Sequence, residues 1–311
     1  VQNMLRVLVC IPHFFRRNSA DSGYSNGSNT DPLNKRLTEF QSCFRQIQSL
    51  LSPSAFTLGT KNRIANEFVN SVPRTTQGDV IVVSVPEENL LAELASDGPL
   101  RARIWSGPPR QLGYECRRVF ARNIGKYDLF CFIEDDTVIT DPAFFRKAAK
   151  FYQTHGEDKV LLPNRFEIFR FKGCGWRAFL DRPNPPSLRS PERPGPDFLK
   201  MPDFDGDVIF EKCTDSTAGA YVITNAQLKA WIEQPNFSAP SQKRLDAGFD
   251  PMELTMIPMD GALPIYRPAE PNLDFLEVHH VPNLATARPT PRRKLLELLN
   301  TETQGEGRGA G

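Results

Sequence analysis

The sequence predicts an α/β protein, a single domain with a mostly parallel central sheet and helices on both faces. Short β-branched runs recur along the chain, and between them lie segments whose apolar residues repeat at helical spacing. Strands that alternate with helices favour a parallel sheet, because each crossover helix packs back onto the sheet. With 311 residues, the chain is long enough to bury a core without disulfide bonds.

The first half of the chain contains two predicted strands with a helix between them. Residues 5–11 (LRVLVCI) form a β-branched run that ends at Pro12, and residues 79–85 (DVIVVSV) form the next run. We expect the helix to begin at the Asp-Pro pair 31–32. Its apolar residues follow at helical spacing: Leu33, Leu37, Phe40, Phe44 and Ile47.

The second half continues this alternation. Residues 111–124 (QLGYECRRVFARNI) predict a helix with apolar residues inward and arginines outward, and residues 128–133 (DLFCFI) predict a third buried strand. The later elements are expected as follows: a helix at 141–154, strands at 159–162, 207–210 and 219–224, a helix at 225–233, and a strand at 275–280 that closes the sheet.

Three segments lack the composition of a folded core. Residues 16–32 are rich in Ser, Asn and Gly, and we expect a mobile loop there that closes over a bound ligand. Residues 173–202 are dominated by Pro, Arg and Gly, which predicts an exposed excursion without strand or helix interior. Residues 301–311 are poor in apolar side chains and predict a disordered tail.

Charge and hydropathy exclude two classes of function. The 38 basic and 37 acidic residues leave a formal net charge of +1, which argues against a nucleic-acid partner. The longest apolar runs, residues 80–85 and 129–133, are far shorter than the about 20 residues that span a membrane. We therefore expect no membrane span, although peripheral contact with a membrane stays open, and no signal peptide before the first strand.

The six cysteines lie far apart and form no CxxC or Cys/His cluster, which argues against a structural zinc site. Most of them sit beside apolar residues in predicted strands or helices, where a buried free thiol is the ordinary state. The sequence therefore indicates a reducing compartment, and we expect a cytoplasmic location. The cysteines are Cys10, Cys43, Cys116, Cys131, Cys174 and Cys213.

Three successive carboxylates, Glu134, Asp135 and Asp136, follow the third predicted strand. In an open parallel sheet, ligands bind at the carboxyl ends of the strands, so the end of the first strand, Pro12 and His13, is also a candidate binding site. Adjacent carboxylates repel one another unless a cation or a helix terminus offsets their charge, and oxygen ligands suit Mg²⁺ or Mn²⁺ together with a phosphate. The alternative is a solvated turn.

The segment RRVFARNIGKYDLFCFIEDDTVIT, residues 117–140, resembles a stretch of the GT-A glycosyltransferases, especially of glycosyltransferase family 2. In that family an Arg- and Asn-rich helix, an apolar strand and an Asp-x-Asp-type motif follow one another. The resemblance implies a GT-A-like, Rossmann-related fold. Residues 1–125 would form its nucleotide-binding half, and residues 126–300 the half with the metal, the acceptor and the catalytic groups.

The same resemblance implies roles for the residues of this segment. Asp136 would bind the metal, Asp135 or Glu134 would contact the ribose or a metal-bound water, and Arg117, Arg122 and Asn123 would lie near the diphosphate. The sequence departs from the family pattern at Glu134, which replaces the first aspartate of the motif. This departure leaves open which carboxylate has which role.

Three later stretches resemble the family in the same order. Residues 217–228 (TAGAYVITNAQL) look like the small-residue strand and helix that face the substrates, which makes Ala218 and Gly219 acceptor candidates. Residues 247–254 (AGFDPMEL) look like the segment that leads to the catalytic carboxylate, so Asp250 and Glu253 are candidates for the general base. In FLEVHH, His279 and His280 stand where many members have a metal-binding histidine.

Each of these stretches also has a structural interpretation. Small residues in a strand can serve close packing. Asp250, which precedes Pro251, can cap a short helix, and this role can coexist with catalysis. Paired histidines can be ordinary core or surface residues, and Asp215 and Asp260 are further candidates for the base.

The sequence as a whole predicts a transferase that uses Mn²⁺ or Mg²⁺ and moves a sugar from a nucleotide-diphosphate sugar to a hydroxyl of a glycan or another acceptor. By the resemblance the donor is a UDP-sugar. One alternative is a sugar-phosphate nucleotidyltransferase, but a Gly-rich basic loop would follow the first strand, where this chain has IPHFFRRNSADSG. The other is a catalytically inactive protein that binds nucleotide or carbohydrate on the same fold.

Overall fold

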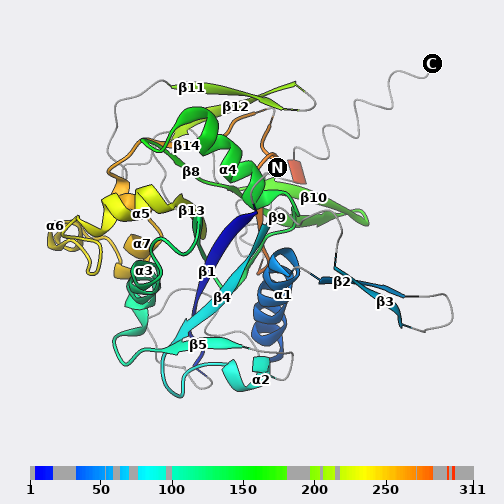
Figure 1. The fold of residues 1–311 in the computed structure, drawn as a ribbon, viewed down its shortest axis with the longest axis horizontal. Coiled ribbons are helices and arrows are strands. Elements are labelled where there is room, and N and C mark those ends of the chain that lie inside the picture. Colours follow the sequence, from blue (N-terminus) through cyan, green and yellow to red (C-terminus); the bar gives the residue numbers. More distant parts are fainter. Residues whose placement is uncertain are drawn as a thin grey trace.

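A computed structural model describes residues 4–16, 33–52, 54–58, 64–69, 76–95, 100–180, 197–203, 206–213, 218–270, 272–282, 293 and 296–297. At its centre is a five-stranded sheet of order β13-β6-β1-β4-β5 (Figure 1). The strands are β1 (Leu5–His13), β4 (Thr76–Ser84), β5 (Arg101–Ile104), β6 (Leu129–Ile133) and β13 (Ala220–Thr224). β13 is antiparallel to β6, and the other pairs are parallel, which confirms the mostly parallel sheet.

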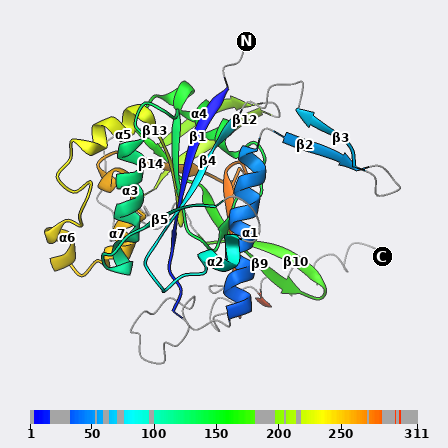
Figure 2. The same ribbon diagram turned by 60° about the horizontal axis from the view of Figure 1, so that its bottom comes forward.

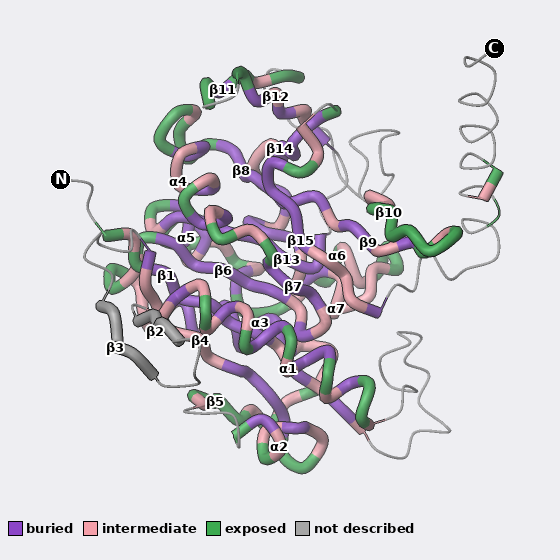
Figure 3. Tube along the Cα trace, turned by 90° about the vertical axis from the view of Figure 1, so that its right-hand side faces the viewer, coloured by how far each residue is buried: buried purple, intermediate pink, exposed green. Residues whose placement is uncertain are grey.

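Helices cover both faces of this sheet, as predicted (Figure 2). On one face, Val9 of β1 packs in the same core cluster as Phe40 of α1 (Leu33–Leu51). On the other, Leu8 and Cys10 pack with Phe120 of α3 (Leu112–Arg122) and with α5 (Asn225–Ile232). Because successive strand residues point to opposite faces, one apolar run in β1 serves both cores. The purple strands in Figure 3 show this burial.

Helix α5 begins where the sequence contains a capping box, Thr224-Asn-Ala-Gln227. Thr224 Oγ1 accepts a hydrogen bond from Gln227 N at 3.1 Å, and Thr224 N donates to Gln227 Oε1 at 3.0 Å. These bonds satisfy backbone groups that the first helical turn leaves unpaired. The remaining helices are α2 (Leu91–Ala95), α4 (Phe144–His155), α6 (Gln242–Asp246), α7 (Pro251–Thr255) and the 3₁₀ helices η2 (Pro109–Gln111) and η3 (Pro258–Gly261).

A second sheet has the order β10-β9-β15-β7, and a third has the order β11-β12-β14-β8. The second contains β7 (Thr137–Val138), β9 (Asn164–Phe171), β10 (Cys174–Phe179) and β15 (Glu277–His280). The third contains β8 (Val160–Leu161), β11 (Phe198–Asp203), β12 (Gly206–Cys213) and β14 (Ile265–Pro268). A separate hairpin joins β2 (Ser54–Leu58) to β3 (Ile64–Val69).

The additional sheets correct two predictions and contain one strand that was predicted. Residues 275–280 do not close the central sheet, because β15 pairs with β9 and with β7 instead. The strand predicted at 159–162 exists as β8, but it pairs with β14 in the third sheet. The predicted excursion 173–202 is wrong at both ends, where β10 and β11 are strands that pair with β9 and β12.

Two other predicted segments, the loop beyond Arg16 through residue 32 and the tail 301–311, lie outside the described residues. All six cysteines are free, and five of them are buried, as expected for thiols in strands and helices. Within the described part of the chain, no helix combines the length and the apolar character needed to cross a membrane.

Candidate functional site

The candidate site lies at the carboxyl edge of the central sheet. β1, β4 and β6 are parallel and end there at His13, Ser84 and Ile133, so Glu134 begins where these strands end. β13 runs in the opposite direction and starts at the same edge, where Glu134 N donates to Gly219 O at 2.8 Å. Figure 2 shows α2, α7 and the β9–β10 hairpin at this end of the sheet.

Asp135 is buried and held by two side chains from distant segments. Its Oδ2 lies 2.5 Å from His13 Nδ1, and its Oδ1 accepts a bond from Arg36 Nη2 at 2.7 Å. Burial alone would raise the pKa of Asp135, but the Arg36 charge and the His13 hydrogen bond outweigh it and lower this pKa to about 2. Both carboxylate oxygens are engaged within the fold, so the predicted contact of Asp135 with a ribose or a metal-bound water gains no support.

His13 also has both ring nitrogens engaged. Leu90 N donates to its Nε2 at 3.0 Å, so we assign the proton to Nδ1, which faces Asp135. The ring stacks on Phe40 with centroids 4.0 Å apart, and burial outweighs Asp135 and lowers the pKa of His13. The structure thus engages His13 with Asp135 and with the backbone, and its donor-binding role stays a prediction. Pro12 is half-buried within β1, in register with Val83.

Asp136 faces a histidine from the second sheet. His280 Nε2 lies 3.8 Å from Asp136 Oδ2, because β15 pairs with β7 and places His280 opposite Thr137. His280 Nδ1 is 2.8 Å from Glu167 Oε1 of β9. Burial lowers the pKa of His280, but Glu167 and Asp136 outweigh it, and the pKa is raised. A carboxylate oxygen that follows the central sheet and an imidazole nitrogen of the second sheet thus approach each other.

His279, the other predicted metal ligand, points away from this pair. Adjacent residues of a strand face opposite sides of the sheet. The His279 ring stacks on Phe166 with centroids 4.9 Å apart and planes 9° apart. The structure therefore separates the two histidines and brings His280 to Asp136.

Glu134 and Gly219 pack closely at the start of β13. Gly219 has φ +64°, and a Cβ built there would lie 2.6 Å from Glu134 Oε2, so the position requires glycine. Burial, followed by the negative charge of Asp136, raises the pKa of Glu134 to about 7, although Arg165 and His280 oppose this shift. Ala218, the second acceptor candidate, is fully buried in the core, which leaves Gly219 as the one of the pair beside the acidic residues.

Arg117, which was predicted to lie near the diphosphate, is engaged within the fold. Its guanidinium is fully buried, donates to Leu254 O at 2.8 Å and to Ile257 O at 3.2 Å, and pairs with Asp260 Oδ1 at 3.2 Å. It also lies over the rings of Tyr114 and Trp231. This arginine fixes the segment of α7 and η3 against α3. Asp260 also accepts from Trp231 Nε1 at 3.2 Å, so it belongs to the same structural cluster.

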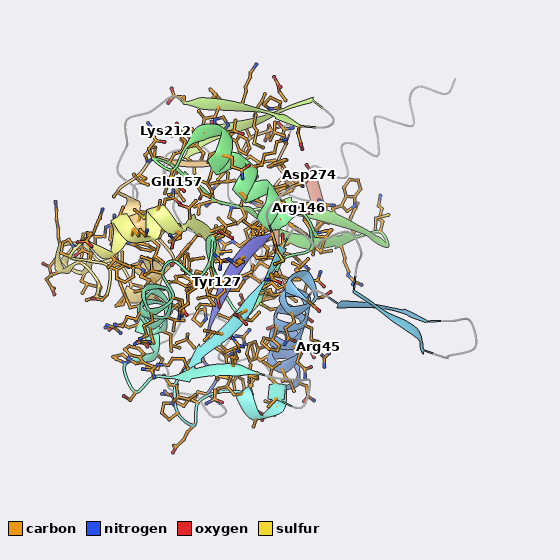
Figure 4. The ribbon with its side chains drawn as sticks, viewed as in Figure 1. Arg45, Tyr127, Arg146, Glu157, Lys212 and Asp274 are labelled. Atoms are coloured by element: carbon orange, nitrogen blue, oxygen red, sulfur yellow. The ribbon has the colours of Figure 1, made fainter. Side chains whose placement is uncertain are left out.

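Arg122 and Asn123 lie at the opposite end of the sheet from the acidic triplet, so the structure does not bring these predicted donor-binding residues to the candidate site. A helix that precedes a parallel strand runs antiparallel to it, so α3 ends near the amino end of β6. Arg122 Nη1 donates to Glu115 Oε1 at 3.0 Å, and Asn123 Nδ2 donates to Val119 O at 2.9 Å. Tyr127, labelled in Figure 4, lies in the segment just before β6, and its hydroxyl donates a hydrogen bond to Asp79 Oδ2 at 2.5 Å.

Asp250 is the N-cap of α7, as the structural interpretation of the sequence predicted. Its Oδ1 accepts from Met252 N at 2.8 Å, and its Oδ2 accepts from Arg110 Nη1 at 2.9 Å. Glu253 follows in the first turn of the same helix. The catalytic role of either carboxylate stays a prediction. Asp215 lies outside the described residues.

Three residues that act on the site were not identified from the sequence: Arg36, Arg165 and Glu167. Arg36 is separated from Asp135 by 99 residues, and Glu167 from His280 by 113. Glu167 is fully buried, and Arg165, two residues earlier on β9, acts electrostatically on Glu134 and on His280. In residues 165–168 (RFEI), charged residues alternate with apolar ones, and this short period of two could have indicated a strand with Arg165 and Glu167 on one face.

The side chains of Asp136 and His280 fit a hard divalent cation. Their 3.8 Å separation is too long for a hydrogen bond, yet one ion with bonds of about 2.0–2.2 Å can bridge it. Among the described residues, no group of three or more histidine, cysteine, aspartate or glutamate ligands surrounds one point. Phosphate oxygens and water would have to complete the shell, which is how Mg²⁺ is usually bound.

Models of known protein families give no match to this chain. Curated protein sequences give none either. Among solved structures, the chain is similar to S. aureus TarS, with a TM-score of 0.42 and 10% identity over 89% of this chain and 37% of that one. It is also similar to TarS 1–349, with a TM-score of 0.40 and 11% identity over 90% and 61% of the two chains.

The same TarS fragment in complex with UDP-GlcNAc gives a TM-score of 0.39 and 11% identity over 89% of this chain and 58% of that one. The chain thus spans less than two thirds of the length of each of these structures. At TM-scores below 0.5, these similarities assign neither a family nor a function to this chain.

Proposed function

We propose that this protein is a metal-dependent glycosyltransferase that moves a sugar from a nucleotide-diphosphate sugar, a UDP-sugar, to a hydroxyl of a glycan or another acceptor. The observation that carries this proposal is the meeting of Asp136 and His280 at the carboxyl edge of a mostly parallel sheet, 3.8 Å apart. Loops from several strands converge at such an edge, and nucleotides bind there in open α/β sheets. The family resemblance of the acidic segment supports the same function.

Asp136 and His280 would hold Mn²⁺ or Mg²⁺ together with the donor diphosphate. The ion supplies positive charge that offsets the charge developing on the leaving diphosphate. Arg36 holds Asp135 and lies 4.0 Å from Asp136 Oδ2, so it fixes the backbone on which Asp136 is presented. Glu134, the first residue of the acidic triplet, packs against Gly219.

Asp250 and Glu253 remain the proposed candidates for the base that takes the proton of the acceptor hydroxyl. Figure 2 shows their helix α7 at the same end of the sheet as the site. The cap of Asp250 and its pair with Arg110 hold the start of this helix in place. An inverting reaction requires such a carboxylate on the far side of the sugar.

The test is a thermal-shift screen of UDP-, GDP-, CMP- and dTDP-sugars with and without Mn²⁺. A true donor at 100 times its Kd stabilises the folded state by about 2.7 kcal/mol, and we expect this only when metal is present. Sugar transfer to hydroxyl acceptors is then measured with the donor that binds. Metal-dependent binding without transfer would support an inactive binding protein, and release of pyrophosphate from a nucleoside triphosphate and a sugar phosphate would support a nucleotidyltransferase.

A further inference from the structure

Glu167 is a fully buried carboxylate on β9 that the reaction outlined above does not use. Its Oε1 lies 2.8 Å from Nδ1 of His280, the histidine that faces Asp136. We propose that Glu167 is a positioning residue: it fixes the tautomer and the orientation of His280 and thereby sets the affinity of the site for a divalent cation. This inference rests on the proposed metal-dependent function.

The pairing of the strands explains why these two side chains meet. β15 runs parallel to β9, with Val278 in register with Arg165 and His279 with Phe166. The next residues, His280 and Glu167, therefore lie side by side, on the face opposite to that of the stacked His279 and Phe166 rings. Strand pairing, not a flexible loop, sets the position of this carboxylate.

The chemistry of imidazole gives the contact a consequence. A neutral histidine has one N–H donor and one nitrogen with a free lone pair. When Nδ1–H donates to Glu167, the lone pair is on Nε2, the nitrogen that lies 3.8 Å from Asp136 Oδ2. Metal-binding histidines commonly donate their second N–H to a carboxylate in this way, because the bond selects the tautomer and orients the ring.

A purely structural role explains the contact less well. A buried charged pair gives little net stability, and apolar residues of the same size would often serve the fold equally well. Arg165 lies on the same face of β9 and adds positive charge near Glu134 and His280. The second sheet thus presents a short charged face, formed by Arg165, Glu167 and His280, to the acidic segment of the first.

The first experiment needs neither a variant nor a ligand. In ¹⁵N-histidine NMR spectra of the metal-free wild-type protein, assigned through His280→Gln, we expect the neutral ring of His280 to carry its proton on Nδ1. A neutral ring protonated on Nε2 would overturn the proposal, because that nitrogen could not bind a metal.

The second experiment measures Mn²⁺ affinity by electron paramagnetic resonance of free Mn²⁺, without nucleotide and with UDP. We expect Glu167→Gln and Glu167→Ala to weaken Mn²⁺ binding by about 10-fold to 100-fold, with the larger loss for alanine. Combined with His280→Ala, either change should cause little further loss, because both act through the same ligand.

The matched control is Glu277→Gln. Glu277 is also a buried carboxylate of the second sheet, but it pairs with Arg177 at 2.8 Å and lies on the face of His279. We expect it to leave Mn²⁺ affinity unchanged. Wild-type affinity in both Glu167 variants, or no Mn²⁺ binding by the wild-type protein, would overturn the inference. Mn²⁺ binding that depends on Glu167 but is insensitive to every nucleotide sugar would instead refute only the proposed function.

Discussion

Two histidine–carboxylate pairs meet the acidic triplet, one through Asp135 itself and one beside Asp136, and they differ in what the second ring nitrogen contacts. In the His13–Asp135 pair, Nε2 of the histidine accepts a backbone hydrogen bond from Leu90 at 3.0 Å. In the His280–Glu167 pair, Nε2 faces the Asp136 carboxylate at 3.8 Å, beyond hydrogen-bond range.

This difference separates a pair that is engaged within the fold from the pair whose histidine we propose as a metal ligand. His13 is fully buried, stacked on Phe40 and bonded through both nitrogens, so no coordination position remains. The side chain of His280 is 12% exposed, and it lies near the carboxyl end of the central sheet. Both histidines are mostly or fully buried, and both contact a carboxylate. What distinguishes the two pairs is therefore the contact of the second ring nitrogen, Nε2.

The largest expected effect is on stability, from His13→Ala. Removal of this neutral, fully buried ring leaves a cavity beside Phe40 and the Asp135 carboxylate with one hydrogen bond fewer, and such a loss costs about 3–5 kcal/mol. Urea unfolding at neutral pH measures this loss. His280→Gln, which keeps a side-chain donor for the buried Glu167 at a position whose side chain is 12% exposed, should cost clearly less. Equal losses in the two variants would break the distinction between the pairs.

The next effect is on binding, from Asp136→Ala. We expect its Mn²⁺-dependent affinity for the donor to fall at least about 100-fold, or about 2.8 kcal/mol, with little loss of stability. Isothermal titration calorimetry measures this affinity. Asp203→Ala is the control, because Asp203 is an exposed carboxylate that pairs with Lys150 at 2.8 Å. Undiminished metal-dependent binding by the Asp136 variant would refute the proposed metal site.

The elements on which the site is built could be predicted from the sequence. β1 and β6 are continuous apolar runs buried on both faces, and such local patterns survive in the fold. The acidic triplet could also be identified in the sequence, because its position directly after β6 depends only on neighbouring residues. The contacts of the α3 arginines could not be predicted, because a basic helix looks the same in the sequence whether its side chains bind phosphate or, like Arg117, backbone carbonyls.

The partners of the triplet could not be predicted in the same way. Arg36 and Glu167 reach their partners across 99 and 113 residues, through helix packing and strand register. Which of His279 and His280 faces the site depends on that register, since a shift by one residue exchanges the two faces of a strand. Without the pairing of β15 and β7, the two histidines are equivalent in the sequence.

A third prediction extends the distinction between fold and site to α7. Asn is as good an N-cap as Asp, so Asp250→Asn should keep the cap on Met252 N and lose the charged pair with Arg110. If Asp250 or Glu253 is the base, Asp250→Asn or Glu253→Gln lowers turnover by about 10²-fold, with donor binding nearly unchanged. Steady-state kinetics of sugar transfer distinguish a purely structural role of these carboxylates from the role of the base. Full transfer rates in both variants would exclude them as the base and favour a retaining reaction or Asp215 as the base.

The smallest expected effect is the pH dependence of stability, and the two histidines contribute to it with opposite signs. Burial lowers the pKa of His13, so the unfolded chain binds more protons below the ordinary pKa of 6.5, and stability from this residue is lost as the pH falls. The carboxylates around His280 overcome its burial and raise its pKa. Its contribution is fully present below pH 6.5 and is lost as the pH rises through the folded-state value.

Urea unfolding of the wild-type protein and of His280→Gln, with EDTA present, isolates the contribution of His280 to the pH dependence of stability. The difference in unfolding free energy between the two proteins should be larger at pH 5.5 than at pH 8, because only the wild-type protein has a histidine whose charged form the fold favours. NMR titration of the wild-type ring protons supplies the other half of the comparison: His13 should stay neutral at a pH where His280 is already protonated. If His13 gains its proton at the higher pH, or if the free-energy difference grows towards pH 8, the assignment of one pair to the fold and the other to the site is wrong.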